Sequence, residues 1–282
     1  RPALFHLHLS ILLRRFLLKG LCMAALFNAL VSDSVILFVV IFILSVGSAY
    51  AGKYLFKKRH GKTELADDET KIVLGAVLSL LGLLIGFLLT ISIGGYNNRE
   101  QMEENEAIAI GNAFQRAQLL SPENTLRANT LLGTYIDARI DFFNGGSQAK
   151  NEKWRDISLD AQSSLWELAA SQARTTPNPV IASVLTAFSD LYVSEEKTMA
   201  SWRYQIPGAA WVLLILFAVS ANVLIGYNIR GLRGSNIMIL ILPLLTTMAL
   251  FMIAEIDIPG EGVIHVVPDN LVNLRADLFP AK

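Results

Sequence analysis

Charged residues are missing from four stretches of the chain, each long enough to cross a membrane. Asp, Glu, Lys and Arg are absent from residues 34–52, 72–98, 204–229 and 234–254. A helix needs about 20 apolar residues to cross a hydrocarbon core of roughly 30 Å, and lipid offers no partner to backbone groups outside a helix. The pattern predicts transmembrane helices at 34–54, 72–96, 207–229 and 235–256.

Residues 97–206, between the second and third predicted spans, show a helical period. Apolar residues recur three and four positions apart, on faces that include Ala107, Ile110, Phe114, Ala117, Leu132, Ile136, Ile140, Phe143, Val180, Val184, Ala187, Phe188 and Leu191. Such faces are typical of amphipathic helices that pack in a bundle. Ser121 and Pro122 are expected to open one helix, and Gly145 with Gly146 to end it. A further helix is expected over Trp154–Ala173.

The helical period continues on both sides of Gly94 and Gly95, where the second span meets charged sequence. Each glycine costs about 1 kcal/mol relative to alanine, which can kink a helix without ending it. We therefore expect one rod over residues 72–120, about 70 Å long at 1.5 Å per residue. Such a rod would tie the bundle rigidly to the membrane. The only candidate strand is "GVIHVV" at 262–267.

Composition agrees with an all-α integral membrane protein whose extramembrane helical bundle lies between transmembrane helices 2 and 3. The chain of 282 residues is 53% hydrophobic and 17% charged, whereas average soluble domains carry about 25% charged residues. The lipid bilayer is thus an expected partner. Because 24 basic residues balance 24 acidic ones, bulk charge does not favour nucleic acid. Cys22 is the only cysteine, so no internal disulfide can form.

The first 22 residues are too interrupted by charge to span a membrane. Met23 opens the sequence that leads into the first span, so we expect residues 1–22 to be an upstream extension. His6 and His8 lie there, and we do not interpret them as a metal pair. At the other end, residues 257–282 are expected to be a C-terminal tail.

Basic residues favour one side of the predicted membrane. The loops that join spans 1–2 and 3–4 hold Lys53, Lys57, Lys58, Arg59, Lys62, Lys71, Arg230 and Arg233. The opposite side offers Arg99, Lys197 and Arg203 near the spans. Basic loops remain in the cytoplasm, so the helical domain is expected on the outer, periplasmic side of a bacterial inner membrane. If residues 1–22 are native, Arg14, Arg15 and Lys19 weaken this bias.

A stripe of small residues runs along one face of the second predicted span. It consists of Gly75, Ser79, Gly82, Gly86, Thr90 and Gly94. Small residues let helices approach closely in lipid. The stripe could pack against another span of the same chain, or against other subunits around a central axis. In the second case the span, which carries no ionisable group, would line an apolar constriction that gates by dewetting.

Several segments in order resemble the bestrophin-like family of bacterial membrane proteins, most of which have no assigned function. They are "LLGLLIGF", "ENEAIAIGNAFQRAQLL", "LLGTYIDARIDFF", "LWELA", "GYNIRG" and "IDIPGEGVIHV", within residues 30 to 275. The resemblance implies kinship with bestrophins, which are pentameric anion channels with four spans and a helical body between the second and third. The chain departs from bestrophins in its acids after the fourth span, where only Glu255, Asp257 and Glu261 occur, interrupted by Pro259. It also departs in sidedness, since bestrophins keep the helical body in the cytoplasm.

Charged residues near the spans are the remaining candidates for function. Glu100, Glu103, Glu104 and Glu106 could form an acidic collar that attracts cations in a symmetric oligomer, or simply a solvated helix start. Family-matching positions Glu106, Arg116, Asp137 and Arg139 could form an interhelical charge network, with a structural role expected. Asp257 follows the fourth span and is either a functional acid or part of a helix-end turn.

Sequence signatures of enzymes are absent from the chain. It has no dinucleotide fingerprint, no phosphate loop, no HExxH and no nucleophile elbow. We expect no enzyme, cofactor or bound metal. The leading hypothesis is a homo-oligomeric ion channel or channel-like protein of unknown selectivity, which would take ions as its ligands. The alternative is a non-conducting membrane scaffold or sensor whose helical domain binds a partner.

Overall fold

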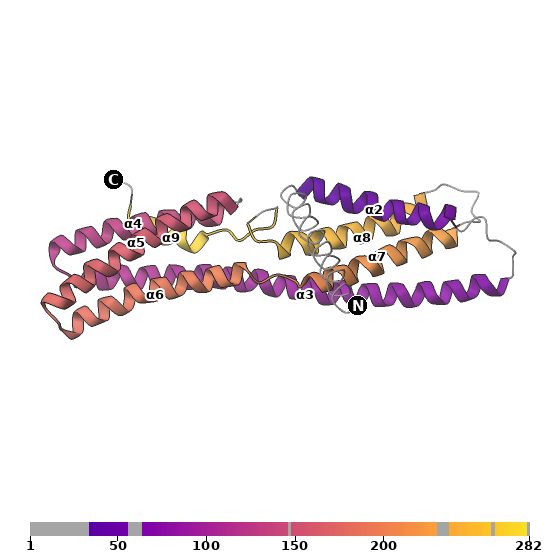
Figure 1. Ribbon diagram of the computed structural model, residues 1–282. Helices are drawn as coiled ribbons and strands as arrows, with labels where there is room; N and C mark the ends of the chain where they lie inside the picture. Colours follow the sequence, from indigo (N-terminus) through magenta and orange to yellow (C-terminus); the bar gives the residue numbers. More distant parts are fainter. Residues whose placement is uncertain (1–33, 56–63, 146–147, 230–236, 261–262, 281–282) are drawn as a thin grey trace, which may run out of the picture. The chain divides into compact units, whose positions relative to one another are not determined.

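The computed structural model of the chain describes residues 34–55, 64–145, 148–229, 237–260 and 263–280, and within them every element is a helix (Figure 1). In chain order the helices are α2 (Ser34–Leu55), α3 (Glu64–Ala117), α4 (Pro122–Asn144), α5 (Gln148–Thr175), α6 (Pro179–Trp202), α7 (Gly208–Asn228), α8 (Ile237–Asp257) and α9 (Asp269–Leu278). The predicted extension at 1–22 and the basic residues at 57–62, Arg230 and Arg233 lie outside the described residues.

Within the described part of the chain, four helices are long and apolar enough to cross a membrane. They are Ser34–Tyr54 of α2, the apolar part of Glu69–Ala117 in α3, Gly208–Asn228, which is α7, and Ile239–Asp257 of α8. The chain is thus an all-α, multi-pass membrane protein, as the uncharged stretches predict.

Helix α3 is unbroken through Gly94 and Gly95, as the helical period predicts. It begins earlier than expected, at Glu64, and ends at Ala117, three residues before the expected Leu120. Its end is tightened because the backbone N–H of Leu120 donates to the carbonyl of Ala117 at 3.1 Å. Such bonds between residues three apart satisfy carbonyls that a helix end leaves free.

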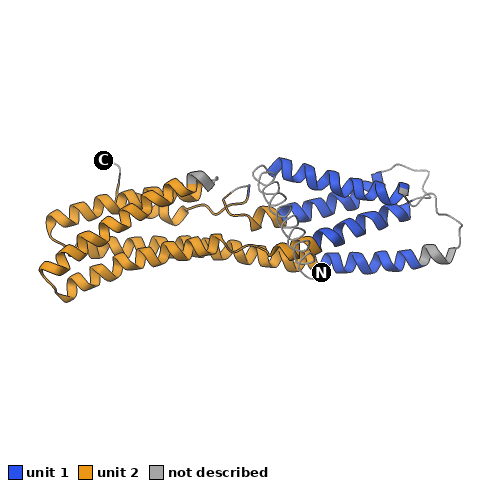
Figure 2. Ribbon diagram, in the orientation of Figure 1, with its two compact units in different colours: residues 1–83, 214–252, 261–263 blue, residues 84–213, 253–260, 264–282 orange. Residues whose placement is uncertain are grey.

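The chain divides into two compact units, coloured in Figure 2. Unit 1 contains residues 1–83, 214–252 and 261–263, and unit 2 contains 84–213, 253–260 and 264–282.

In unit 1, α2 and α7 approach closely at two glycines. A Cβ at Gly52 would collide with the backbone of Val223, and one at Gly226 with the backbone of Ala49. Close backbone approach at small residues is the usual way helices pack in lipid. Among the described glycines of unit 1, Gly52 and Gly226 thus bring α2 and α7 into close backbone contact.

Unit 2 is a bundle of α4, α5, α6 and α9 with residues 84–117 of α3 (Figure 1). The expected apolar faces meet in one core, whose fully buried members include Ile110, Leu132, Ile136, Leu165 and Leu191. Burying such side chains supplies the main favourable free energy of folding, about 1.5–3 kcal/mol each. This bundle is the extramembrane body predicted between the second and third spans.

Three expectations for the helical body need correction. Residues 263–267 form no strand, and Val266 of this segment packs into the core. The region predicted as a tail contains α9, whose Leu271 is fully buried in that core. Helix α5 starts at Gln148, before the expected Trp154. The expectation rested on apolar residues, and most of the residues between 148 and 153 are polar.

Candidate functional site

The small-residue stripe of α3 is exposed along its whole length in the chain. No atom lies within 4 Å of a Cβ built on Gly75, Gly82, Gly86 or Gly94. The hydroxyls of Ser79 and Thr90 donate to carbonyls of their own helix, those of Gly75 and Gly86, at 2.9 Å each. The described part of the chain therefore offers the stripe no partner helix, in contrast to the glycine contacts between α2 and α7.

The four acids expected as a collar separate into two pairs. Glu100 and Glu104 are exposed, whereas Glu103 and Glu106 are 1% and 0% exposed. The helical period explains the separation, since residues three and four apart share a face and Glu103 and Glu106 lie on the face of buried Ile110. A collar of four solvated acids is therefore not what the chain forms.

Glu103 holds the beginning of α9. Its carboxylate accepts hydrogen bonds from the backbone N–H of Leu271 at 2.9 Å and from Nδ2 of Asn270 at 2.7 Å. A carboxylate at a helix N-terminus satisfies free N–H groups and complements the helix dipole. This acid thus ties α9 to α3.

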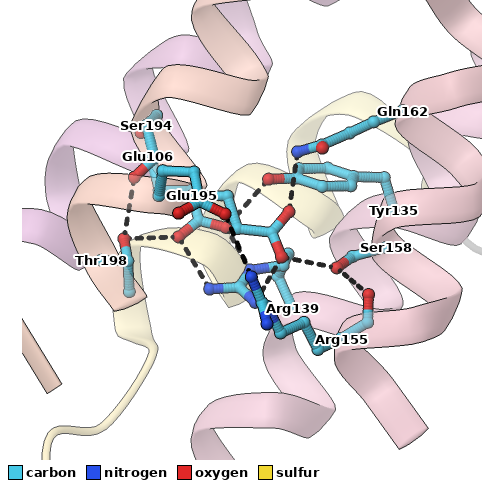
Figure 3. Close-up of polar contacts among 10 residues, drawn as sticks. Glu106, Tyr135, Arg139, Arg155, Ser158, Gln162, Ser194, Glu195 and Thr198 are labelled. Atoms are coloured by element: carbon cyan, nitrogen blue, oxygen red, sulfur yellow. Dashed lines mark hydrogen bonds and ion pairs between the residues drawn. The ribbon is translucent and has the colours of Figure 1, made fainter. Parts of the chain in front are cut away.

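Glu106 and Arg139 form the centre of a buried polar cluster, drawn in Figure 3. Both Glu106 oxygens receive hydrogen bonds from the guanidinium: Nε donates to Oε1, and Nη2 donates to Oε2 at 3.1 Å. Tyr135 donates its hydroxyl to the same carboxylate at 3.1 Å, and Thr198 donates at 2.8 Å. This paired geometry is the strongest form of an Arg–carboxylate contact.

Glu195 of α6 adds a second carboxylate to the same cluster. It lies 3.4 Å from Nη1 of Arg139, and it accepts hydrogen bonds from Ser158 at 2.9 Å and from Gln162 at 2.7 Å. The cluster therefore joins α3, α4, α5 and α6 and holds two carboxylates against one guanidinium. Its formal charge is −1 when both acids are ionised.

The cluster shifts the pKa values of its members. Burial raises the pKa of Glu195, although the Arg139 charge acts in the opposite direction. Burial disfavours the charge of Arg139, but Glu106, Tyr135 and Glu195 together outweigh burial and hold the pKa of the guanidinium above its usual value. Burial, with the charge of Glu106, raises the pKa of the Tyr135 hydroxyl well above its usual value. Burial thus favours the neutral form of Glu195.

We expect Glu195→Gln to gain stability relative to the wild type as pH rises. Between the ordinary pKa of Glu195 and its raised folded value, the unfolded chain loses the proton first, so wild-type stability falls across that window. The variant has no proton to lose, and the unpartnered Oε1 of Gln162 can turn toward the new amide. Melting temperatures at pH 4 and pH 7.5 measure the effect, roughly 2–4 °C for each kcal/mol.

Glu196→Gln is the matched control, because Glu196 is a half-exposed neighbour paired with Arg155. If the wild-type and Glu195→Gln melting temperatures change in parallel with pH, this assignment of the raised pKa is wrong.

The other residues named from sequence lie apart from the cluster. Arg116 donates to the carbonyl of Ser183 at 3.0 Å, and Asp137 pairs with Arg275 at 2.7 Å on the surface. Of the four expected network residues, the chain brings together only Glu106 and Arg139. Asp257 is 6% exposed and accepts a hydrogen bond from the backbone N–H of Ile206 at 2.9 Å. It therefore joins the end of α8 to the segment that leads into α7.

Sequence reasoning missed five cluster members: Tyr135, Ser158, Gln162, Glu195 and Thr198. A signal was present in α6, because Glu195 and Thr198 continue the apolar face of Phe188 and Leu191 at helical spacing. Polar residues in line with a buried face are buried with it, and a buried charge needs a partner. Among the described residues, no three His, Cys, Asp or Glu side chains gather as a metal site.

Comparison with known proteins shows the family. The model of the bestrophin-like domain matches residues 39–271. The chain belongs to the bestrophin-like family. No curated protein matches this bestrophin-like sequence.

Two crystal structures of a membrane protein, each with a different single substitution, share the fold. One aligns with a TM-score of 0.59 at 10% identity, covering 87% of this chain and 97% of the other. The second aligns with a TM-score of 0.55 at 11% identity, covering 85% and 97%. At such identities the likeness extends to the fold of this bestrophin-like chain and no further.

Proposed function

We propose that the chain forms a homo-oligomeric channel or channel-like membrane protein in which copies of α3 face one another. The observation that carries the proposal is the exposed small-residue stripe, which has no partner within the described chain. Gly82 and Gly86 are four residues apart, the spacing at which transmembrane helices associate closely. In the proposed oligomer, α3 of a second copy packs against the stripe and buries it.

The conduction path we propose is an apolar constriction. Residues 72–98 hold no ionisable group, and the exposed Leu83 and Phe87 flank the stripe. A pore lined by such residues gates by dewetting. The exposed Glu100 and Glu104 follow this apolar stretch, and in a symmetric oligomer they repeat around the axis and attract cations. We therefore propose a preference for cations over anions, and no catalytic activity.

We propose that the protein lies in a bacterial inner membrane with residues 97–206 on the outer side. The support is the excess of basic residues in the loops around residues 53–71 and 230–233, which the positive-inside rule assigns to the cytoplasm. Reporter fusions at residues 62 and 150 test the sidedness. Activity of a cytoplasmic reporter at 150 would reverse it.

Ion flux into liposomes tests the channel directly. The full chain is reconstituted after its oligomeric state has been verified, and uptake of K⁺ and Cl⁻ is followed separately. We expect K⁺ flux above that of empty vesicles. Background flux from an intact oligomer overturns the channel, and specific capture of a partner by residues 97–206 would then favour the scaffold or sensor.

A further inference from the structure

The buried cluster of unit 2 contains one more acid than it has bases to pair with them. Glu106 and Glu195 both lie against Arg139, and all three side chains are at most 1% exposed. When both acids are ionised, one negative charge is left over, and an uncompensated charge in a protein interior is costly. One bound proton removes that charge, provided that the hydrogen bonds of the cluster leave a place for it.

The carboxylate of Glu106 leaves no such place. Nε of Arg139 donates to one of its oxygens and Nη2 donates to the other. A guanidinium can only donate hydrogen bonds, so a proton on either oxygen of Glu106 competes with a donor that is already there. Tyr135 and Thr198 also donate to this carboxylate. These contacts match an ionised Glu106.

The carboxylate of Glu195 differs because one of its partners can reverse its hydrogen bond. Oε1 of Glu195 lies 2.9 Å from the hydroxyl of Ser158, and the same hydroxyl lies 2.8 Å from the carbonyl of Arg155 (Figure 3). A serine hydroxyl has one hydrogen and can also accept, so it donates to only one of these oxygens at a time. With Glu195 ionised, the hydroxyl donates to Oε1. With Glu195 protonated, Oε1–H donates to the hydroxyl, which then donates to the Arg155 carbonyl.

The remaining contacts of Glu195 are compatible with a proton on Oε1. Nε2 of Gln162 donates to Oε2 at 2.7 Å, and this oxygen remains an acceptor in the protonated acid. Nη1 of Arg139 lies 3.4 Å from Oε1, longer than a normal charge-assisted hydrogen bond. Protonation therefore sacrifices no short hydrogen bond of Glu195 and requires no heavy atom to move.

The charged and titratable groups that face Glu195 come from three helices. They are Glu106 of α3, Tyr135 and Arg139 of α4, and Arg155 of α5. Burial has the largest effect and raises the pKa of Glu195, the Glu106 charge acts in the same direction, and the two arginines oppose it. Because the folded pKa lies above the unfolded one, the bound proton stabilises the fold at low pH, and this stabilisation is lost as pH rises through the folded value.

We propose that Glu195 is a single proton-binding site of the helical body, with the proton on Oε1 and the hydroxyl of Ser158 as its acceptor. The proton comes from the solvent, and rotation of the Ser158 hydroxyl completes its binding. Uptake neutralises the cluster and strengthens the junction between α5, which carries Ser158, and α6, which carries Glu195. The body thus senses acidification by becoming more rigid. The site does not depend on conduction, so it stands or falls separately from the proposed channel.

Infrared difference spectra of the full chain in detergent test the site through the C=O stretching band of protonated carboxyl groups. We expect one band that persists above the pH at which exposed glutamates lose their protons. It should be absent from Glu195→Gln and present in Glu196→Gln, whose side chain is 39% exposed. Ser158→Ala removes the proposed acceptor, so the band should move to higher frequency. Ser163→Ala, at an exposed serine of the same helix, should leave the band unchanged.

Backbone hydrogen exchange of the wild-type chain gives a second readout that does not depend on a variant folding. After correction for the intrinsic pH dependence of exchange, amides of α5 and α6 near Ser158 and Glu195 should be better protected below the transition of the band than above it. Equal protection on both sides overturns the sensing role. The site is overturned if the wild type lacks the band, if Glu195→Gln keeps it, or if Ser158→Ala leaves its frequency unchanged.

Discussion

Arg139→Met is expected to destabilise the helical body strongly. The change leaves the carboxylates of Glu106 and Glu195, at 0% and 1% exposure, without the guanidinium that pairs with both of them. Removing one partner of a buried ion pair typically costs about 3–5 kcal/mol. Tyr135, Thr198 and Gln162 still donate hydrogen bonds, but they cannot neutralise the charge. Thermal unfolding of the full chain in detergent measures the loss.

Arg174→Met is the control for this prediction. Arg174 pairs with Glu167 at 3.0 Å, but both side chains are more than 60% exposed, and such surface pairs contribute about 0–1 kcal/mol. Arg139→Met combined with Glu106→Gln should recover part of the loss, because the pair then leaves one buried carboxylate instead of two. Equal melting temperatures for Arg139→Met and Arg174→Met would contradict the prediction, because they would show that losing Arg139 costs no more stability than losing a surface arginine.

Gly86→Leu is expected to weaken subunit association at least about tenfold and to abolish ion flux, while the monomer remains folded. Within the chain a side chain at Gly86 enters open space, and leucine is a better helix former than glycine by roughly 0.8 kcal/mol. Between subunits the same side chain separates the facing helices and removes their packing. Native mass spectrometry and liposome flux measure the two effects.

Two variants bracket this result. Leu83→Ala changes an exposed residue of α3 that lies off the stripe, and it should leave the oligomer intact. Gly226→Ala places a Cβ against the backbone of Ala49 and should lower the stability of the monomer. If Gly86→Leu still forms an intact oligomer, the stripe is not the subunit contact. The channel proposal then loses its main support.

The helical pattern of the sequence predicts those helices whose stability is local. Uncharged runs of about 20 residues can only be helices in lipid, so the four spans followed from composition alone. The period of three and four residues predicted α4, α6 and the unbroken course of α3 through Gly94 and Gly95. These features are local, since each depends on residues within a few turns of one another.

Helix α9 was missed because its stability is not local. It has ten residues, from Asp269 to Leu278, and isolated helices of that length are marginal in water. It forms where Leu271 enters the core and Glu103 accepts the N–H at its first turn. No window of sequence around residue 271 contains those partners, which come from α3 and α4.

The difference between local and tertiary features also applies to the acidic residues of α3. From the sequence, Glu100, Glu103, Glu104 and Glu106 are one acidic run after a membrane span. Packing decides that two of them remain in water while Glu103 holds α9 and Glu106 holds Arg139. Sequence by itself determined the fold class and the family, because these depend on hydrophobicity and local period. Only the tertiary structure decided which charges are buried and which glycines are exposed, because a residue's partners are set by helices distant along the chain.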